Sequence, residues 1–474
     1  MVTASKSSIV EAATTRRTRS GAPKLGFFGG TGTVTGSKYL IRTRQTKVLV
    51  DCGMFQGFKQ LRLRNWAPPP FKVSQISAVV LTHAHIDHSG YLPLLVKNGY
   101  RGPVYCSLGT AELCQIMLPD AGHLQEEEAK YANRHAFSKH KPALPLYTVE
   151  DANQALKLLR PLPFGKTHTI ADDISVRLDR NGHIIGSAAL TFNVEGRKLV
   201  FSGDLGRPND NMMRAPQLLT EADYLVVEST YGNRLHAKVD AADAICEIID
   251  RTLRRKGVVV IPAFAVGRAQ SILHHVYQLR KAGRIPDVPI YLNSPMSVDA
   301  TRLFARHQDE HKLSRAEYEE LCHAVTIVNT ADNSRHLNTL DKPMVIVSAS
   351  GMATGGRVLH HIVRFAPDPK NTILFAGFQA AGTRGAKMVE GATEIKIFGD
   401  YVPIRAEVAS LDCLSSHADY LELLAWLKGF RQPPKMTFIT HGEPSAADAL
   451  RLHIEEKLHW PCHVPDYMET VTLK

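Results

Sequence analysis

Three histidines and an aspartate fall within six residues directly after an apolar run, in the segment LTHAHIDHSG (residues 81–90). Alternate residues of a strand face the same side, so His83 and His85 share one side, and the following turn brings Asp87 and His88 round. Imidazole nitrogen and carboxylate oxygen are ligands that zinc accepts. Four such groups are too many for one ion that keeps an open coordination position. The spacing therefore predicts two ions, one held by His83 and His85 and the other by Asp87 and His88.

Length and composition indicate a globular protein with more than one domain. The chain has 474 residues, of which 44% are hydrophobic and 22% charged, and domains usually contain about 100–200 residues. No stretch approaches the roughly 18 consecutive apolar residues of a membrane helix. No apolar signal-peptide region lies near the start either. We therefore expect a cytoplasmic protein without a membrane partner.

Charge and cysteine usage add two further expectations. The net charge is +11, and residues 1–24 contribute +4 of it, from five basic residues and one acidic residue. We expect these 24 residues to form a disordered basic tail, and the remaining positive charge is compatible with a polyanionic partner. The seven cysteines are scattered and form no CxxC pair. We expect them to be reduced, mostly buried and not metal ligands.

Two patterns divide the rest of the chain. Short β-branched strands and glycine turns fill residues 25–210 around a polar helical stretch at 110–160, and short strands return near the end. The segment GGTGTVTGSK (residues 29–38) is not a phosphate-binding loop, because that loop requires Gly-Lys-Ser/Thr in this order. Its alternation and turn glycines predict hairpin strands.

Helices and strands alternate in the middle of the chain. Residues 241–256 carry Ile245, Ile248, Ile249 and Leu253 at helical spacing and end at Gly257. Strands and helices then follow in turn to about residue 378, which is typical of a parallel sheet covered by helices. We expect an α/β domain at residues 211–390, inserted into a first domain made of residues 25–210 and 391–474.

The His-x-His-x-Asp-His motif resembles the signature of the metallo-β-lactamase superfamily. The resemblance implies an αββα sandwich with two Zn²⁺ ions per chain and further ligands at strand ends. His183 in NGHIIGSA matches the third histidine, and Asp204 in LVFSGD matches the bridging aspartate. His441 in FITHGE matches the last ligand of the second ion, and Asp51 in VLVDCG matches an aspartate that orients the ligands.

The inserted domain makes the chain similar to one branch of that superfamily, the β-CASP nucleases. Glu228 in VVEST, His417 in SSHAD and His441 match the three motifs of the branch, and members that act on RNA carry histidine at the third. The resemblance implies a zinc-dependent ribonuclease for single-stranded RNA, and a homodimer is an expectation from the resemblance alone. We expect a hydroxide activated by two zinc ions to attack, Asp87 to act as ligand and catalytic residue, and His417 to be the general acid paired with Glu228.

Three loops of the expected inserted domain are candidates for substrate binding. Helix N-termini and arginine side chains bind phosphate groups. The loops AFAVGRAQ, SASGMATGGRVLHH and AGTRGAK combine both features. The candidate residues are Gly267, Arg268, Ser350, Gly351, Arg357 and Arg384, which together would form a groove for single-stranded RNA.

Two other functions stay open. A metal-dependent hydrolase could act on DNA or on a small ester, although His441 argues against DNA, and the inserted domain and His417 argue against small esters. A non-catalytic RNA-binding scaffold is the third hypothesis. Relatives of that kind lose metal ligands, whereas every expected ligand is present here. Endonuclease and exonuclease action are equally compatible with the sequence.

Overall fold

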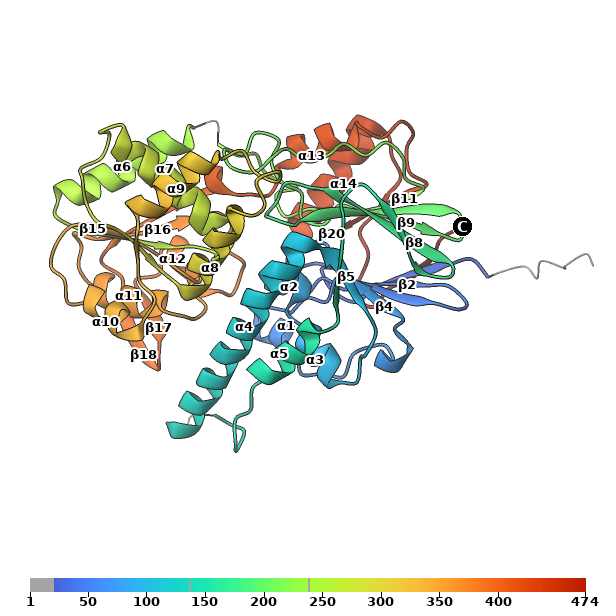
Figure 1. Ribbon diagram of the computed structural model, residues 1–474, viewed down its shortest axis with the longest axis horizontal. Coiled ribbons are helices and arrows are strands. Elements are labelled where there is room, and N and C mark those ends of the chain that lie inside the picture. Colours follow the sequence, from blue (N-terminus) through green and yellow to red (C-terminus); the bar gives the residue numbers. More distant parts are fainter. Residues whose placement is uncertain (1–20, 136–137, 238) are drawn as a thin grey trace, which may run out of the picture.

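The computed structural model describes residues 21–135, 138–237 and 239–474 (Figure 1). The predicted disordered tail, residues 1–24, lies outside the described residues except for its last four. The last of these, Lys24, begins strand β1 (Lys24–Phe27). No disulfide joins any of the seven cysteines, all of which the structure describes, and four of them are buried. No described helix is both long enough and apolar enough to span a bilayer.

Two seven-stranded sheets form the larger part of the molecule. The first contains, in order, β22 (Thr470–Thr472), β1, β2 (Tyr39–Arg42), β3 (Lys47–Val50), β4 (Ala78–Val80), β5 (Val104–Ser107) and β6 (Leu159–Leu162). The second contains, in order, β21 (Cys462–His463), β20 (Met436–Thr440), β11 (Tyr224–Glu228), β10 (Arg197–Phe201), β9 (Ala188–Val194), β8 (Ile174–Arg180) and β7 (Thr167–Ala171).

The two sheets pack face to face because each contributes apolar side chains to one shared core. This core includes Phe27, Ile41 and Val50 from the first sheet and Val176, Leu178, Phe192 and Phe201 from the second. Helices α3 (Leu92–Lys97), α4 (Leu108–Arg134) and α5 (Val149–Leu156) cover the outer face of the first sheet. Helices α13 (Tyr420–Leu427) and α14 (Pro444–Leu458) cover the second. The layering confirms the predicted αββα sandwich.

A third sheet, of six parallel strands, forms the part of the molecule at the left of Figure 1. Its order is β14 (Thr326–Ile327), β13 (Ile290–Asn293), β15 (Met344–Ser348), β12 (Val258–Pro262), β16 (Thr372–Ala376) and β19 (Glu407–Leu411). Along β12, Val259 and Ile261 face one layer of helices, whereas Val258 and Val260 face the other. The sheet is therefore buried on both faces, as the alternating pattern predicts.

Helices on both faces complete this inserted domain. One layer contains α6 (Ala241–Arg254), α7 (Arg268–Lys281), α8 (Pro295–Phe304) and α9 (Arg315–Ala324). The other contains α10 (Ala331–Leu337), α11 (Val358–Phe365) and α12 (Arg384–Val389). The helix predicted at residues 241–256 is thus present as α6, two residues shorter at its C-terminal end.

Strand pairing extends the inserted domain beyond residue 390, where we expected it to end. Strand β19 pairs with β16, and the hairpin of β17 (Glu394–Ile397) and β18 (Asp400–Pro403) packs Ile395 and Ile397 into the same core. At the other boundary, β11 pairs with β10 and β20 of the sandwich, although it follows residue 211. We therefore propose limits near residues 241 and 411 for the inserted domain.

The glycine-rich segment between β1 and β2 is a loop. Strands β1 and β2 pair in antiparallel fashion, as predicted, but residues 28–38 between them belong to no strand. The buried Lys38 ammonium closes this loop, because it donates to the carbonyl oxygens of Gly53 and Gly36. It also lies 4.8 and 4.4 Å from the ring centroids of Phe55 and Tyr91.

The burial of Lys38 predicts a pH-dependent stability. Burial lowers the pKa of Lys38 from 10.5 to about 8, so the proton is bound more tightly in the unfolded chain. Below pH 8 the folded protein carries the full free-energy cost of burying the Lys38 ammonium. This cost disappears as the pH rises to 10.5, because the folded protein then holds the neutral amine. We expect the free energy of unfolding of the wild type minus that of Lys38→Met to rise by about 3 kcal/mol across this range.

Urea denaturation at several pH values measures this difference. The matched control is Lys59→Met, which removes an exposed lysine and should leave the pH dependence of the wild type unchanged. A constant difference between wild type and Lys38→Met would contradict the prediction.

Candidate active site

The predicted metal ligands come together at one edge of the sandwich, where several strands end. His83 and His85 follow β4, and Asp87 and His88 lie on the short helix α2 (Ile86–Ser89). His183 lies between β8 and β9, Asp204 follows β10, and His441 follows β20. Strands β10, β11 and β20 are parallel neighbours, so their carboxyl ends meet at the same edge. Segments far apart in the sequence thereby supply one cluster.

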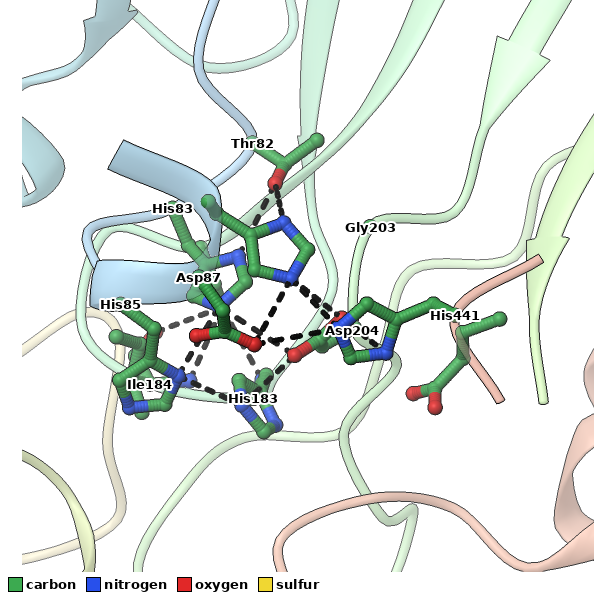
Figure 2. Close-up of polar contacts among 12 residues, drawn as sticks. Thr82, His83, His85, Asp87, His183, Ile184, Gly203, Asp204 and His441 are labelled. Carbon is green, nitrogen blue, oxygen red and sulfur yellow. Dashed lines mark hydrogen bonds and ion pairs between the residues drawn. The ribbon is translucent and has the colours of Figure 1, made fainter. Parts of the chain in front are cut away.

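One group of donors surrounds a single point. His85 Nδ1 lies 3.0 Å from His83 Nε2 and 3.2 Å from His183 Nε2. Asp204 Oδ2 lies 3.5 Å from His83 Nε2 and 3.6 Å from His183 Nε2. Ligand atoms bound to one tetrahedral zinc ion would be about 3.3 Å apart. Figure 2 shows these side chains converging, and their spacing fits one cation.

A second group shares Asp204 with the first. His88 Nε2 lies 3.0 Å from His441 Nε2 and 3.2 Å from Asp204 Oδ1. Asp87 Oδ2 lies 3.3 Å from His441 Nε2. Asp204 Oδ1 is buried and accepts no hydrogen bond of normal geometry, which is costly for a carboxylate oxygen. A cation between these donors would satisfy it, so the donor set fits a second metal ion.

The charge states of the histidines suit the two groups. Burial holds the pKa of His83 and His183 well below its ordinary value and lowers that of His85 to about 4. These imidazoles are therefore neutral, which is the form that binds metal. Burial also disfavours the charged form of His88, but the carboxylates around it, Asp204 foremost, raise its pKa well above the usual range. A positive charge is thus favoured at the second group.

Asp51 contacts donors of both groups, His88 directly and His83 through Thr82. Its Oδ2 lies 2.8 Å from His88 Nδ1, and its Oδ1 accepts a hydrogen bond from the Thr82 backbone N–H at 2.7 Å. The Thr82 hydroxyl lies 3.0 Å from His83 Nδ1. Contacts of this kind fix the ring orientation of metal-binding histidines. Thr82, next to His83 in the sequence, was not predicted, because a threonine at a strand end has no distinctive pattern.

His441 has a similar support that the sequence also did not predict. The Thr230 hydroxyl lies 3.2 Å from His441 Nδ1, which leaves Nε2 of the same ring facing Asp87 and His88. Thr230 follows Glu228 by two residues, so only its proximity to a predicted motif could have indicated this role.

His417 and Glu228 form a pair beside the metal ligands. His417 Nδ1 lies 3.2 and 3.1 Å from the two carboxylate oxygens of Glu228. Glu228 Oε1 also accepts the Leu205 N–H at 2.6 Å. Burial disfavours the charged form of His417, but the Glu228 carboxylate outweighs this effect and raises the pKa of His417. The His417 ring lies 4.6 Å from that of His183, so the charged form of this imidazole is favoured directly beside the predicted metal ligands.

Two of the predicted substrate-binding residues, Gly267 and Arg268, lie at the contact between the domains, and two more, Ser350 and Gly351, lie in a loop of the inserted domain. The buried Arg268 donates from Nη2 to Ser416 Oγ at 3.3 Å, directly beside His417. Gly267 leaves no room for a side chain, because a Cβ there would lie 2.8 Å from Ile184 Cγ2. A Cβ at Gly351 would likewise lie 2.8 Å from Phe264. The remaining member, Ser350, has its hydroxyl 3.1 Å from that of Thr354.

Arg357 and Arg384 are engaged inside the inserted domain. Arg357 donates to the carbonyl oxygens of Val328 and Asn329 and to Asn293 Oδ1. Arg384 donates to the backbone carbonyls of residues 353, 354 and 396. Arg384 therefore holds the glycine-rich loop of residues 351–356, and Arg357 ties the beginning of α11 to the segment after β14. These contacts are with protein, and the structure does not bring either side chain to the metal ligands.

Comparison with known proteins identifies the family. A metallo-beta-lactamase superfamily model matches residues 31–242, a Beta-Casp domain model residues 269–388, and a Zn-dependent metallo-hydrolase RNA specificity domain model residues 401–465. Ribonuclease TTHA0252 of Thermus thermophilus is 38% identical over 436 residues, which are 89% of this chain and 94% of that protein. The chain belongs to the β-CASP branch of the metallo-β-lactamase superfamily.

Two further relatives place this β-CASP protein in a wider group. Transcription termination factor FttA of Methanosarcina mazei is 32% identical over 94% of this chain and 71% of its own length. An RNase J-like protein of Methanocaldococcus jannaschii is 30% identical over 93% of this chain and 97% of its own length. The β-CASP protein is therefore a metal-dependent hydrolase of the nuclease branch.

Removal of Asp204 tests the two-metal geometry, because this carboxylate belongs to both groups. We expect Asp204→Ala, incubated with zinc and desalted, to bind both ions at least about 100-fold more weakly than the wild type. Elemental analysis and chelator competition measure this loss. Asp287→Ala is the control, since that side chain is 93% exposed. A full zinc content in Asp204→Ala would contradict the assignment of Asp204 to both groups of metal-binding donors.

Proposed function

We propose that this β-CASP protein is a zinc-dependent ribonuclease that hydrolyses the phosphodiester bonds of single-stranded RNA. The observation that carries the proposal is the single carboxylate, Asp204, shared by two groups of metal-binding donors beside a histidine that belongs to neither. The relationship to Ribonuclease TTHA0252 and the match to an RNA specificity domain support RNA as the substrate.

The chain offers a complete donor set for two zinc ions. His83, His85 and His183 would hold one ion, Asp87, His88 and His441 would hold the other, and Asp204 would contact both. When bound, two zinc ions would activate water for attack and neutralise the charge that develops on the phosphate. Asp51 and Thr82 keep the His88 and His83 rings in orientation for this role.

His417 supplies the proton that the leaving oxygen needs. Its Nδ1 is committed to the Glu228 carboxylate, so its Nε2 carries the proton available for transfer. Glu228 is itself held by the Leu205 N–H, which fixes the direction of the pair. A histidine placed in this way as a general acid contributes about 10²–10⁴ in rate.

Arg268 provides a positive charge next to this acid. Its hydrogen bond to Ser416 uses one of the five N–H donors of the guanidinium group, and the others remain for a phosphate oxygen. A phosphate bound there would lie beside His417, which follows Ser416 in the chain. Contacts to phosphate position a strand without reading its sequence, as expected for an enzyme that accepts RNA of varied sequence.

Replacement of His417 separates catalysis from metal binding. We expect His417→Ala to keep the zinc content of the wild type and to lose about 10²–10⁴ in the cleavage rate of RNA, because it removes the general acid but no ligand. His336→Ala, an exposed histidine on α10, is the control. If His417→Ala cleaved RNA at the wild-type rate, the leaving group would obtain its proton elsewhere.

Parallel substrates test the proposal against its alternatives. We expect turnover of a single-stranded RNA to exceed that of the same sequence in DNA and of a chromogenic ester by at least about 100-fold, since a substrate without the favoured contacts loses transition-state stabilisation. Preferred turnover of DNA or of the ester would overturn the substrate assignment. RNA binding without cleavage, at full zinc occupancy, would instead support the scaffold hypothesis. Cleavage of a circular RNA in the same assay identifies endonuclease action.

A further inference from the structure

The loop that carries His183 lies between the two domains. It joins β8 to β9 in the sandwich, and Ile184 packs in one apolar cluster with Val266 of the inserted domain. Gly267 approaches the same side chain so closely that a Cβ there would lie 2.8 Å from Ile184 Cγ2. The position of His183, one of the proposed metal ligands, therefore depends on contacts at the boundary between the two domains.

Gly186 of this loop is held from both domains. Its carbonyl oxygen accepts hydrogen bonds from Ser107 Oγ at 2.5 Å and Thr110 Oγ1 at 2.8 Å, both at the beginning of α4. Its N–H donates to Glu310 Oε2 at 2.6 Å. Glu310 lies between α8 and α9 of the inserted domain. The backbone of Gly186 is thus hydrogen-bonded to the sandwich through its carbonyl oxygen and to the inserted domain through its N–H group.

The Glu310 side chain is itself held on both oxygens. It is 6% exposed, and its Oε1 lies 3.2 Å from His307 Nδ1. His307 Nε2 in turn lies 2.7 Å from Glu112 Oε2 on α4. A buried carboxylate is costly unless its oxygens have partners, and a hydrogen bond from an N–H to a charged oxygen is about twice as strong as a neutral one. The contact with Gly186 is therefore a strong constraint on the loop.

Gly186 is linked to His183 through Ser187, its neighbour in the chain. Ser187 Oγ accepts hydrogen bonds from the backbone N–H groups of His183 and Ile184, both at 3.1 Å. The Gly186 backbone has a φ of 79°, and a Cβ there would lie 2.1 Å from the Thr110 backbone nitrogen. The loop therefore has one arrangement when Glu310 is in place, and that arrangement puts His183 Nε2 3.2 Å from His85 Nδ1.

We propose that Glu310 is a positioning residue for the metal site of His83, His85 and His183. The inserted domain then sets the metal affinity of the sandwich, through the hydrogen bond between Glu310 and the Gly186 N–H. This inference rests on the proposed zinc sites and goes beyond them, because it assigns a determinant of metal binding to a domain that contributes no ligand. Partners of this kind typically contribute about 10–100-fold in metal affinity.

Zinc titration of the full-length protein in competition with a chromophoric chelator tests the proposal. Glu310→Ala removes the acceptor for Gly186, and Glu310→Met removes it while filling the same space, which guards against a cavity that prevents folding. Glu310→Gln keeps an oxygen for the Gly186 N–H. Glu319→Ala, on α9 of the same domain and 55% exposed, is the matched control. Thermal unfolding of the metal-free forms reports separately on folding.

We expect one of the two zinc-binding steps to weaken by about 10–100-fold in Glu310→Ala and Glu310→Met, with Glu310→Gln and Glu319→Ala close to the wild type. The absorption spectrum of the cobalt-substituted protein should change in the same two variants, because the geometry at His183 changes. Wild-type affinity in Glu310→Met, or an equal loss in Glu310→Gln, would overturn the role of the hydrogen bond. Failure of the wild type to bind zinc would overturn the proposed function itself.

Discussion

The carboxylate of Asp204 is the point on which the site depends. It is 2% exposed, and its two oxygens face different groups of imidazoles. Burial alone would favour the protonated acid, but the neighbouring histidines, His441 foremost, hold the pKa of Asp204 well below its ordinary value. So many polar groups stay close together only because strand ends of a rigid sandwich carry them. The apolar core between the sheets therefore stabilises an arrangement that is unfavourable by itself.

The backbone around the site is also held in unusual conformations. Asp51 and His441 have φ values of 57° and 50°, in the left-handed region that non-glycine residues seldom adopt. Each is fixed by a backbone hydrogen bond, from Asp51 to Val80 O at 2.9 Å and from His441 to Gly30 O at 2.5 Å. Local strain of this kind persists where surrounding contacts over-determine the conformation. The glycine-rich loop that contains Gly30 therefore holds His441, one of the proposed metal ligands.

The inserted domain contributes to this site in a different way from the sandwich. It supplies none of the metal-binding donors, but it places Arg268 beside Ser416 and His417. It also places Phe264 with its ring 6.3 Å from that of His85. The proposed substrate contacts and the proposed metal ligands thus come from separate domains that must be docked correctly for the site to be complete. The hydrogen bond between Glu310 and Gly186 links this docking to the position of a ligand.

The sequence by itself predicted most of the elements and the first four candidate ligands, because both predictions depend on residues that are neighbours in the chain. Ile245, Ile248 and Ile249 mark one face of α6, and His83 to His88 follow one strand. Only the tertiary structure decided which distant segments meet. Strand β19 pairs with β16 of the inserted domain, and carbonyl oxygens of the same domain accept hydrogen bonds from Arg357 and Arg384. No periodicity in the sequence predicts such contacts, because they depend on how complete domains pack and not on neighbouring residues in the chain.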